Sequence, residues 1–179
     1  MTDESIMEAV KSGNLQQVSV LFDRHHKSVF NFLAKMTMNR ELAEDLTQNV
    51  FLRIIKYKGS YREGLRFQSW MFQVARNVFS DHYQAHKNNY SMSMDVDKIK
   101  DSIEETTESV DQAEREKLLH QSLAKLDASD RELLVLTRFE QMKYEEVAAI
   151  METTVANIKV KVHRAIGKLR EHYFELEKM

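Results

Sequence analysis

The most chemically capable side chains lie between residues 61 and 83, where aromatic rings and arginines alternate. Exposed rings stack on unpaired bases for about 1–3 kcal/mol each, and arginine neutralises phosphate, so such a group can hold single-stranded nucleic acid. The competing interpretation, which composition alone favours, is that the rings form a helical core; we expect this for about half of them, Trp70 and Phe72 included. The group consists of Tyr61, Phe67, Trp70, Phe72, Phe79, Tyr83, Arg62, Arg66 and Arg76.

A second group is a basic run between Thr153 and Arg170, which holds five basic residues and no acidic one. An ordinary solvated helix face usually mixes both signs of charge, so an acid-free run in a chain with 28 acidic residues favours contact with DNA phosphates. Within it, Asn157 suits a base edge, and Ala156 or Val160 suits a thymine methyl group. The residues on the side opposite the apolar stripe, or flanking that side, are Ala156, Asn157, Lys159, Val160, His163 and Arg164.

Signs of catalysis are few. The sequence has no glycine-rich phosphate loop, nucleophile elbow or HExxH zinc motif, and it has no cysteine. His82 and His86 are spaced to share a metal on one helix face, but no third ligand accompanies them. We therefore expect a protein that is not an enzyme and that needs no metal or other cofactor.

The elements that carry these groups are expected to be helices. The chain has no proline and four glycines among 179 residues, so it lacks the turn residues of a β sandwich or barrel. No apolar stretch approaches the roughly 20 residues of a membrane span. We predict an all-α, cytoplasmic protein without membrane insertion.

Charge divides the chain into three parts. Residues 1–86 have a net charge of +2 and residues 115–179 a net charge of +1, whereas residues 87–114 hold three lysines against eight acidic residues, a net of −5. The middle part has too few large apolar residues to offset its ordering entropy. We therefore predict two small helical domains, 1–86 and 115–179, joined by a flexible acidic linker at 87–114. Periodicity from Asp111 onward leaves an exposed helix there open.

In the first domain, apolar periodicity predicts a helix capped by Asn14, a second over 40–57 and a third over 68–86. In the second domain, Ser129 and Glu132 match a capping box. A short helix over 144–151 follows, then a polar break ending at Thr154, a suitable N-cap, and a longer helix. Helix, short turn and helix form a helix-turn-helix unit, a common reader of duplex DNA.

Three motifs resemble those of bacterial RNA polymerase sigma factors, most closely the extracytoplasmic-function group. They are Asp45-Leu46-Thr47-Gln48-Asn49-Val50-Phe51-Leu52-Arg53, Phe67-Gln68-Ser69-Trp70-Met71-Phe72-Gln73-Val74-Ala75-Arg76-Asn77, and Tyr144-Glu145-Glu146-Val147-Ala148 with Ile158-Lys159-Val160-Lys161-Val162-His163-Arg164-Ala165. The likeness covers residues 15–89, as in sigma region 2, and 115–173, as in sigma region 4. It implies a protein that binds core RNA polymerase, directs it to specific promoters and helps open the −10 DNA.

The resemblance also implies roles for individual residues. Contact with the coiled coil of the polymerase β′ clamp falls to Asp45, Gln48, Asn49 and Arg53. Reading and melting of the −10 element falls to Arg66, Phe67, Arg76, Asn77 and Asp81, with Trp70 bracing the loop. Reading of the −35 element falls to Ala156, Asn157, Lys159, Val160, His163 and Arg164. The implied partners are core polymerase, through its β′ clamp and β flap, promoter DNA in duplex and single-stranded form, and an anti-sigma factor.

The chain departs from the usual family pattern at a few positions. Asn49 replaces a common acid, Asp127 follows Leu126 where Leu-Pro is usual, and Glu152 replaces the common turn glycine. Residues 82–89 contain only Lys87 as a certain cation, although this part of the family is often strongly basic. The alternatives to a sigma factor are a polymerase-independent helix-turn-helix regulator and a helical interaction module that binds no nucleic acid.

Overall fold

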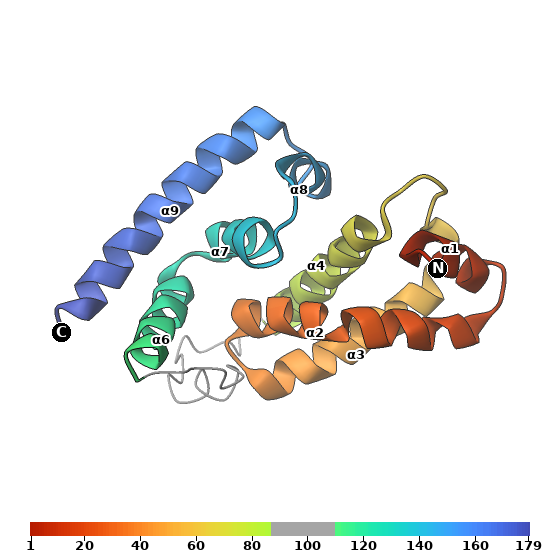
Figure 1. Cartoon of the computed structure of the whole chain (residues 1–179), viewed down its shortest axis with the longest axis horizontal. Helices are drawn as coiled ribbons and strands as arrows, with labels where there is room; N and C mark the ends of the chain where they lie inside the picture. Colours follow the sequence, from red (N-terminus) through yellow and green to blue (C-terminus); the bar gives the residue numbers. More distant parts are fainter. Residues whose placement is uncertain (87–109) are drawn as a thin grey trace. The chain divides into compact units, whose positions relative to one another are not determined.

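The computed structural model describes residues 1–86 and 110–179, which contain eight α-helices and no strand (Figure 1). This confirms the predicted all-α fold. The chain divides into two compact units, one built from Met1–Leu33 and Glu41 onward, the other from Ala34–Arg40 and the C-terminal residues. Most of the predicted acidic linker, residues 87–109, lies outside the described residues.

The first unit contains four helices and two short 3-10 turns. The predicted helices over 40–57 and 68–86 agree with the structure to within one residue at each end. The first helix of the chain was not predicted. The elements are α1 (Asp3–Lys11), η1 (Leu15–Gln17), α2 (Val18–Thr37), α3 (Arg40–Lys56), η2 (Lys58–Ser60) and α4 (Phe67–Ala85).

Helix α1 forms because its ends are well capped and one face is apolar. The Thr2 hydroxyl accepts a hydrogen bond from the Ser5 backbone N–H at 3.1 Å, which satisfies a donor of the first turn. At the other end, Gly13 has a φ of 110°, and the Asn14 N–H donates to the Ala9 carbonyl at 3.0 Å, as in a Schellman motif. Asn14 thus completes the end of α1, and the prediction that its side chain caps the next helix is wrong.

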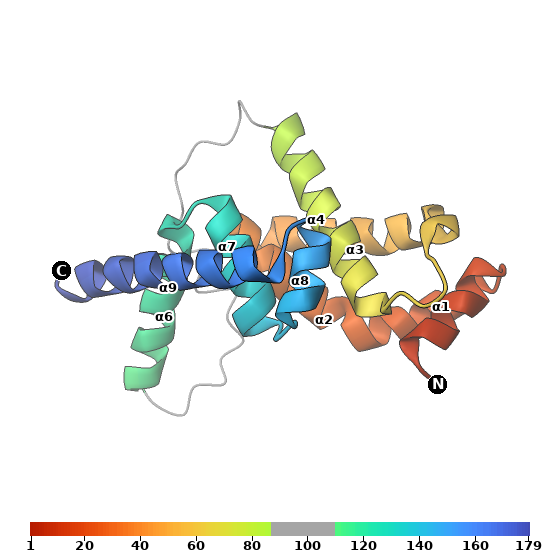
Figure 2. The ribbon, with the colours of Figure 1, turned by 90° about the horizontal axis from the view of Figure 1, so that it is seen from above.

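Helices α2 and α3 run antiparallel, and α4 crosses them (Figures 1 and 2). Aromatic side chains fill the space between these helices. The Phe32 and Phe72 ring centroids lie 5.7 Å apart between α2 and α4, and those of Phe22 and Phe51 lie 5.0 Å apart between α2 and α3. This packing fixes which sides of α3 and α4 remain exposed.

The second unit is arranged around one long helix that packs against the other three helices of the unit. Its first helix begins at Val110, inside the range predicted as linker, where the periodicity from Asp111 had left a helix open. The elements are α6 (Val110–Lys125), α7 (Ala128–Leu134), the π-helical segment η3 (Val135–Phe139), α8 (Tyr144–Ile150) and the long helix α9 (Val155–Glu177).

The start of α7 is capped by Asp127, whose Oδ1 accepts a hydrogen bond from the Asp130 N–H at 2.8 Å. The predicted capping box of Ser129 and Glu132 is therefore wrong, because both residues already lie inside the helix. The resemblance implied a helix start without the family's usual proline, and the Asp127 side chain supplies the cap. Arg131 then donates hydrogen bonds to carbonyls at the end of α6, those of Leu123, Ala124 and Leu126.

Candidate nucleic-acid and polymerase interface

The exposed side of α3 presents a polar surface with one large apolar residue. Asp45, Gln48 and Asn49 are exposed, and Leu52 on the same helix is 62% exposed. The opposite side of α3 is buried in the first unit through Ala43, Leu46, Val50 and Ile54. A leucine exposed among polar side chains offers apolar area to a partner, which suits a protein contact.

Arg53 belongs to neither the exposed nor the buried side of α3, because its side chain is half-buried. Its guanidinium Nη1 lies 2.8 Å from the Asp81 carboxylate Oδ2 on α4. The resemblance assigned Arg53 to the polymerase and Asp81 to the −10 DNA, whereas the structure brings the two side chains together.

The aromatic group between residues 61 and 83 is mostly core. Tyr61, Phe67 and Trp70 are at most 8% exposed, and their ring centroids lie 5.3–6.4 Å apart. Phe72 and Phe79 are also buried, so of the six rings only Tyr83 is exposed. Phe67, which the resemblance assigned to the −10 element, is itself buried, and its ring packs inward. Trp70 packs in the same cluster of buried rings. The resemblance implied that Trp70 braces the neighbouring loop.

Burial makes the phenol of Tyr61 a weaker acid. Desolvation, with the nearby negative charges of Glu4, Glu8 and Asp3, raises the pKa of its phenol to about 12. The neutral hydroxyl donates a hydrogen bond to the Leu65 carbonyl at 2.6 Å. Tyr61 thus holds the backbone of the residues that follow it in the sequence.

Those residues, Arg62–Arg66, form what we call the tip loop, and all five are exposed. Gly64 adopts a φ of 87°, a conformation that an L-residue avoids, so a glycine is required for this turn. Leu65 is 44% exposed at the tip. Along α4, Asn77 is exposed and Arg76 half-buried, so the tip loop and α4 both present polar groups to solvent.

The turn between α8 and α9 is closed by hydrogen bonds at both helix ends. Glu152 has a φ of 54°, and the Thr153 and Glu152 N–H groups donate to the Ala148 and Ala149 carbonyls at 2.9 and 3.3 Å. This is a Schellman motif with glutamate in the position that glycine usually takes. The Thr154 hydroxyl then caps α9 by accepting from the Asn157 N–H at 3.1 Å, which confirms the predicted cap.

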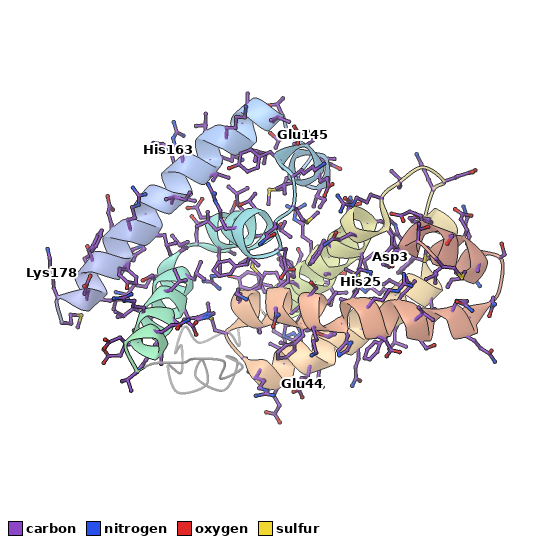
Figure 3. All side chains as sticks on the ribbon, viewed as in Figure 1. Asp3, His25, Glu44, Glu145, His163 and Lys178 are labelled. Atoms are coloured by element: carbon purple, nitrogen blue, oxygen red, sulfur yellow. The ribbon has the colours of Figure 1, made fainter. Side chains whose placement is uncertain are left out.

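Five of the six residues predicted to read the −35 element are exposed on α9, namely Ala156, Lys159, Val160, His163 and Arg164. His163 lies on the outer side of the helix, away from α7 and α8 (Figure 3). Asn157 is half-buried, and its Nδ2 donates a hydrogen bond to the Thr153 Oγ1 at 2.7 Å. Its side chain therefore supports the turn.

Lys168, farther along α9, differs from the other cations of the basic run. Its Nζ lies 2.9 Å from the Asp130 carboxylate on α7, and this hydrogen bond raises the pKa of Lys168. The ion pair ties α9 to α7 and directs this charge toward the protein.

Further features of the described residues bear on metal binding and on membrane insertion. Outside 87–109, no group of three or more His, Cys, Asp or Glu side chains is placed to hold a metal ion. The rings of His82 and His86 are stacked, with their centroids 4.2 Å apart. Burial, and to a smaller extent the charge of His86, lowers the pKa of His82. Among the described helices, none is both long and apolar enough to cross a membrane.

Comparison with known families decides the identity. Residues 21–89 match the model of sigma-70 region 2, and residues 116–169 match that of sigma-70 region 4. The chain is 34% identical over 173 residues to the RNA polymerase sigma factor CarQ of Myxococcus xanthus, covering 96% of this chain and 97% of CarQ. It belongs to the extracytoplasmic-function sigma factors. The resemblance inferred from the three motifs is thereby confirmed.

This sigma factor is also 31% identical over 157 residues to the extracytoplasmic-function sigma factor SigM of Bacillus subtilis, covering 87% of this chain and 94% of SigM. Among solved structures, its fold is similar to that of CnrH in complex with the cytosolic domain of CnrY, with a TM-score of 0.71 and 21% identity over 94% of this chain and 95% of that one. The sigma factor RpoE of Bartonella quintana, crystallised with the anti-sigma factor NepR, gives 0.66 and 22% over 86% and 94%.

The matches assign helices of the structure to the two sigma regions. Helices α3 and α4 with the tip loop fall within region 2, and α8 with most of α9 falls within region 4. Helix α1 precedes the residues that match region 2. Sequence reasoning missed α1 altogether, although Thr2 and Gly13 carry the signals of its two ends.

Proposed function

We propose that this sigma factor docks on core RNA polymerase through the exposed side of α3 and reads promoter DNA with two separate surfaces. The tip loop and α4 read and open the −10 element, and α9 reads the −35 element as duplex. The observation that carries the proposal is the exposed face of α9 over residues 155–170, which holds no acidic residue and begins at a well-capped helix-turn-helix, in a chain that also contains a region 2 fold. The helix-turn-helix alone would fit a simple DNA-binding regulator.

The chemistry of the two DNA surfaces differs in the way the two tasks require. Helix α9 enters the major groove of duplex DNA, where Lys159 and Arg164 supply cations for the phosphates. On the same helix, Ala156 and Val160 suit contacts with thymine methyl groups. The −10 surface has to favour unpaired over paired DNA, because holding the separated strand shifts the melting equilibrium toward the open state. Since Phe67 and Trp70 are buried, this contact falls to the tip loop, Arg66, Arg76 and Asn77.

The polymerase contact is assigned to Asp45, Gln48, Asn49 and Leu52 on α3, with Arg53 at the edge. Leu52 was not among the residues that the motif suggested; its exposure adds it here. Asn49 lowers the negative charge of this side relative to the usual acid, which suits a polymerase surface of correspondingly weaker positive charge. We assign a β-flap contact to region 4 on the family resemblance alone.

A protein inhibitor is a further expected partner. Two relatives of similar fold were solved in complexes, one with the cytosolic domain of CnrY and one with the anti-sigma factor NepR. We propose that this chain also has an anti-sigma partner, that it acts in the cytoplasm, and that it works by binding and not by catalysis. Co-purification from native cells tests the inhibitor proposal directly: a protein retained stoichiometrically and displaced by core polymerase is the expected result.

The experiment that tests the whole proposal is transcription with purified core RNA polymerase and the full chain on a pool of genomic promoter fragments. Specific start sites that appear only with the chain support it. Duplex binding without core binding would instead favour a polymerase-independent regulator, and binding of neither would favour an interaction module.

A further inference from the structure

Helix α1 contacts the chain on both sides of the tip loop. The Lys11 Nζ donates a hydrogen bond to the Tyr61 carbonyl at 2.7 Å, one residue before the loop begins. The Glu4 Oε1 accepts a hydrogen bond from the Phe67 N–H at 3.2 Å, one residue after it ends. These partners are 50 and 63 positions apart in sequence, so both bonds are tertiary contacts that only the folded unit provides.

Both bonds satisfy backbone groups at points where the chain changes direction. Arg66, the N-cap residue of α4, makes no side-chain capping bond, and the Glu4 carboxylate supplies the cap from another helix. Between the two anchors, the Tyr61 hydroxyl bonds the Leu65 carbonyl and the Leu65 N–H donates to the Arg62 carbonyl at 3.2 Å. The tip loop is therefore a turn with internal bonds whose two ends are held from α1.

Helix α1 is itself fixed in the unit. Ile6, Met7 and Val10 are at most 1% exposed. Asp3 lies 3.0 Å from Arg24 and 2.8 Å from His25, both on α2, and Figure 3 shows the neighbouring positions of Asp3 and His25. Desolvation opposes the charge of Asp3, but its bonds to Arg24 and His25 prevail and lower its pKa. Helix α1 thus links α2 to the tip loop.

We propose that α1 is a positioning element for the tip loop, and that Lys11 and Glu4 are the positioning residues that set the loop's selectivity for an unpaired promoter base. The inference rests on the proposed role of the loop at the −10 element. A loop discriminates between bases only as well as its backbone is held, because a shift of about an ångström removes the geometry on which a specific contact depends. Helix α1 lies outside the region 2 match, so that match assigns it no part in recognition.

The test uses the full chain bound to core polymerase. The probe is a library of short single-stranded DNA, randomised over the −10 positions, which is bound, recovered and sequenced. The variants are Lys11→Met and Glu4→Gln. Matched controls are Lys27→Met and Glu41→Gln, which change exposed residues of the same types on α2 and α3. Lys11→Arg serves as a repair because it keeps a charged donor.

We expect the preference at one position to fall by about threefold to tenfold in both variants, because Lys11→Met removes a charge-assisted hydrogen bond and Glu4→Gln leaves an acceptor that has lost its charge. The controls and Lys11→Arg keep the preference, and affinity for core polymerase stays constant in every variant. Hydrogen exchange provides a readout without DNA: the Phe67 amide exchanges faster in Glu4→Gln, while amides of α3 do not. If Lys11→Met does not fold, Glu4→Gln carries the test, because it removes one charge at nearly constant size.

The outcomes separate this inference from the function on which it rests. A wild-type holoenzyme without any base preference overturns both. A wild-type preference that persists unchanged in Lys11→Met and Glu4→Gln overturns the positioning role and leaves the proposed function standing. Loss of core affinity in step with loss of preference also overturns it, since α1 then serves only the stability of the unit.

Discussion

Arg53 of α3 and Asp81 of α4 form an ion pair, with 2.8 Å between the guanidinium Nη1 and the carboxylate Oδ2. The pair joins the helix proposed to contact the polymerase to the helix proposed to contact −10 DNA. Its side chains are 32% and 64% exposed, so solvent screens the attraction. Such a pair adds little to stability, typically about 0.2–1 kcal/mol, and its larger effect is on which partner Arg53 can reach.

Replacing Asp81 releases Arg53 from this pair. We expect Asp81→Ala to leave core-polymerase affinity equal to that of the wild type or up to about fivefold tighter, and Arg53→Ala to weaken it. Titration of labelled variants with core polymerase measures both, and Asp81→Asn serves as the isosteric control. A loss of core affinity in Asp81→Ala as large as in Arg53→Ala would contradict the assignment of only Arg53 to the polymerase.

The salt dependence of duplex binding tests α9. Phosphate contacts by the four basic residues of the run other than the ion-paired Lys168 give a slope of log K against log salt of about −3 to −4, from roughly −0.9 per contact. Removing Lys159 and Arg164 together should make that slope less steep by about 2 and weaken binding to a duplex selected from a random pool. Lys178→Ala, beyond the end of α9, is the matched control (Figure 3). An unchanged slope in the double variant would reject α9 as the −35 reader.

Asn77 tests the −10 surface independently of the tip loop. Its side chain is exposed on α4, so Asn77→Ala should not perturb the core of the unit. We expect normal affinity for core polymerase and a loss of open complexes of about tenfold, the size of a single good contact to a base. Permanganate reactivity of melted thymines measures the open complex, and Asn31→Ala on α2 is the control for an exposed helical asparagine. Normal reactivity in Asn77→Ala would refute its role.

The left-handed backbone at Glu152 makes a prediction about stability. This conformation costs an L-residue about 1–2 kcal/mol, part of which glycine loses again through its greater freedom in the unfolded chain. We expect Glu152→Gly to raise the free energy of unfolding by about 0.5–1 kcal/mol, and Glu152→Val to lower it by about 1 kcal/mol. Chemical denaturation measures both against Glu152→Asn, which tolerates this φ. Equal stability of the valine and asparagine variants would show that the turn relaxes in solution.

Long helices were the part of the fold that could be predicted, because their periodicity extends over several turns. Helices α3 and α4 and the helix-turn-helix were located from apolar spacing and from the Thr154 cap. Helix α1 was not, since its nine residues carry only a short apolar face and an isolated helix of that length is marginal in water. Its stability comes from burying Ile6, Met7 and Val10, which the local sequence does not reveal.

The candidate site was predictable where exposure follows directly from helix geometry. The stripe of Ile158, Val162 and Ala165 is buried, which leaves Lys159, Val160 and His163 exposed as periodicity requires. The burial of Phe67 could not be predicted, because a dense group of aromatic residues has the same composition whether the rings face solvent or the core. Lys11 and Glu4 were missed because a bond between residues 50 or more positions apart depends on the tertiary fold.

The tip loop is exposed along all five residues; its two ends are anchored from α1, and inside it the Leu65 carbonyl accepts a hydrogen bond from the Tyr61 hydroxyl. Except for Gly64, whose φ restricts the choice of residue, its side chains contribute little to the core, so most replacements there leave folding intact. Under the proposed role of the tip loop at the −10 element, residues 62–66 can therefore be exchanged to change promoter choice while the contacts that hold the loop are kept. An engineer seeking sigma factors that ignore one another's promoters would begin with the four positions other than Gly64.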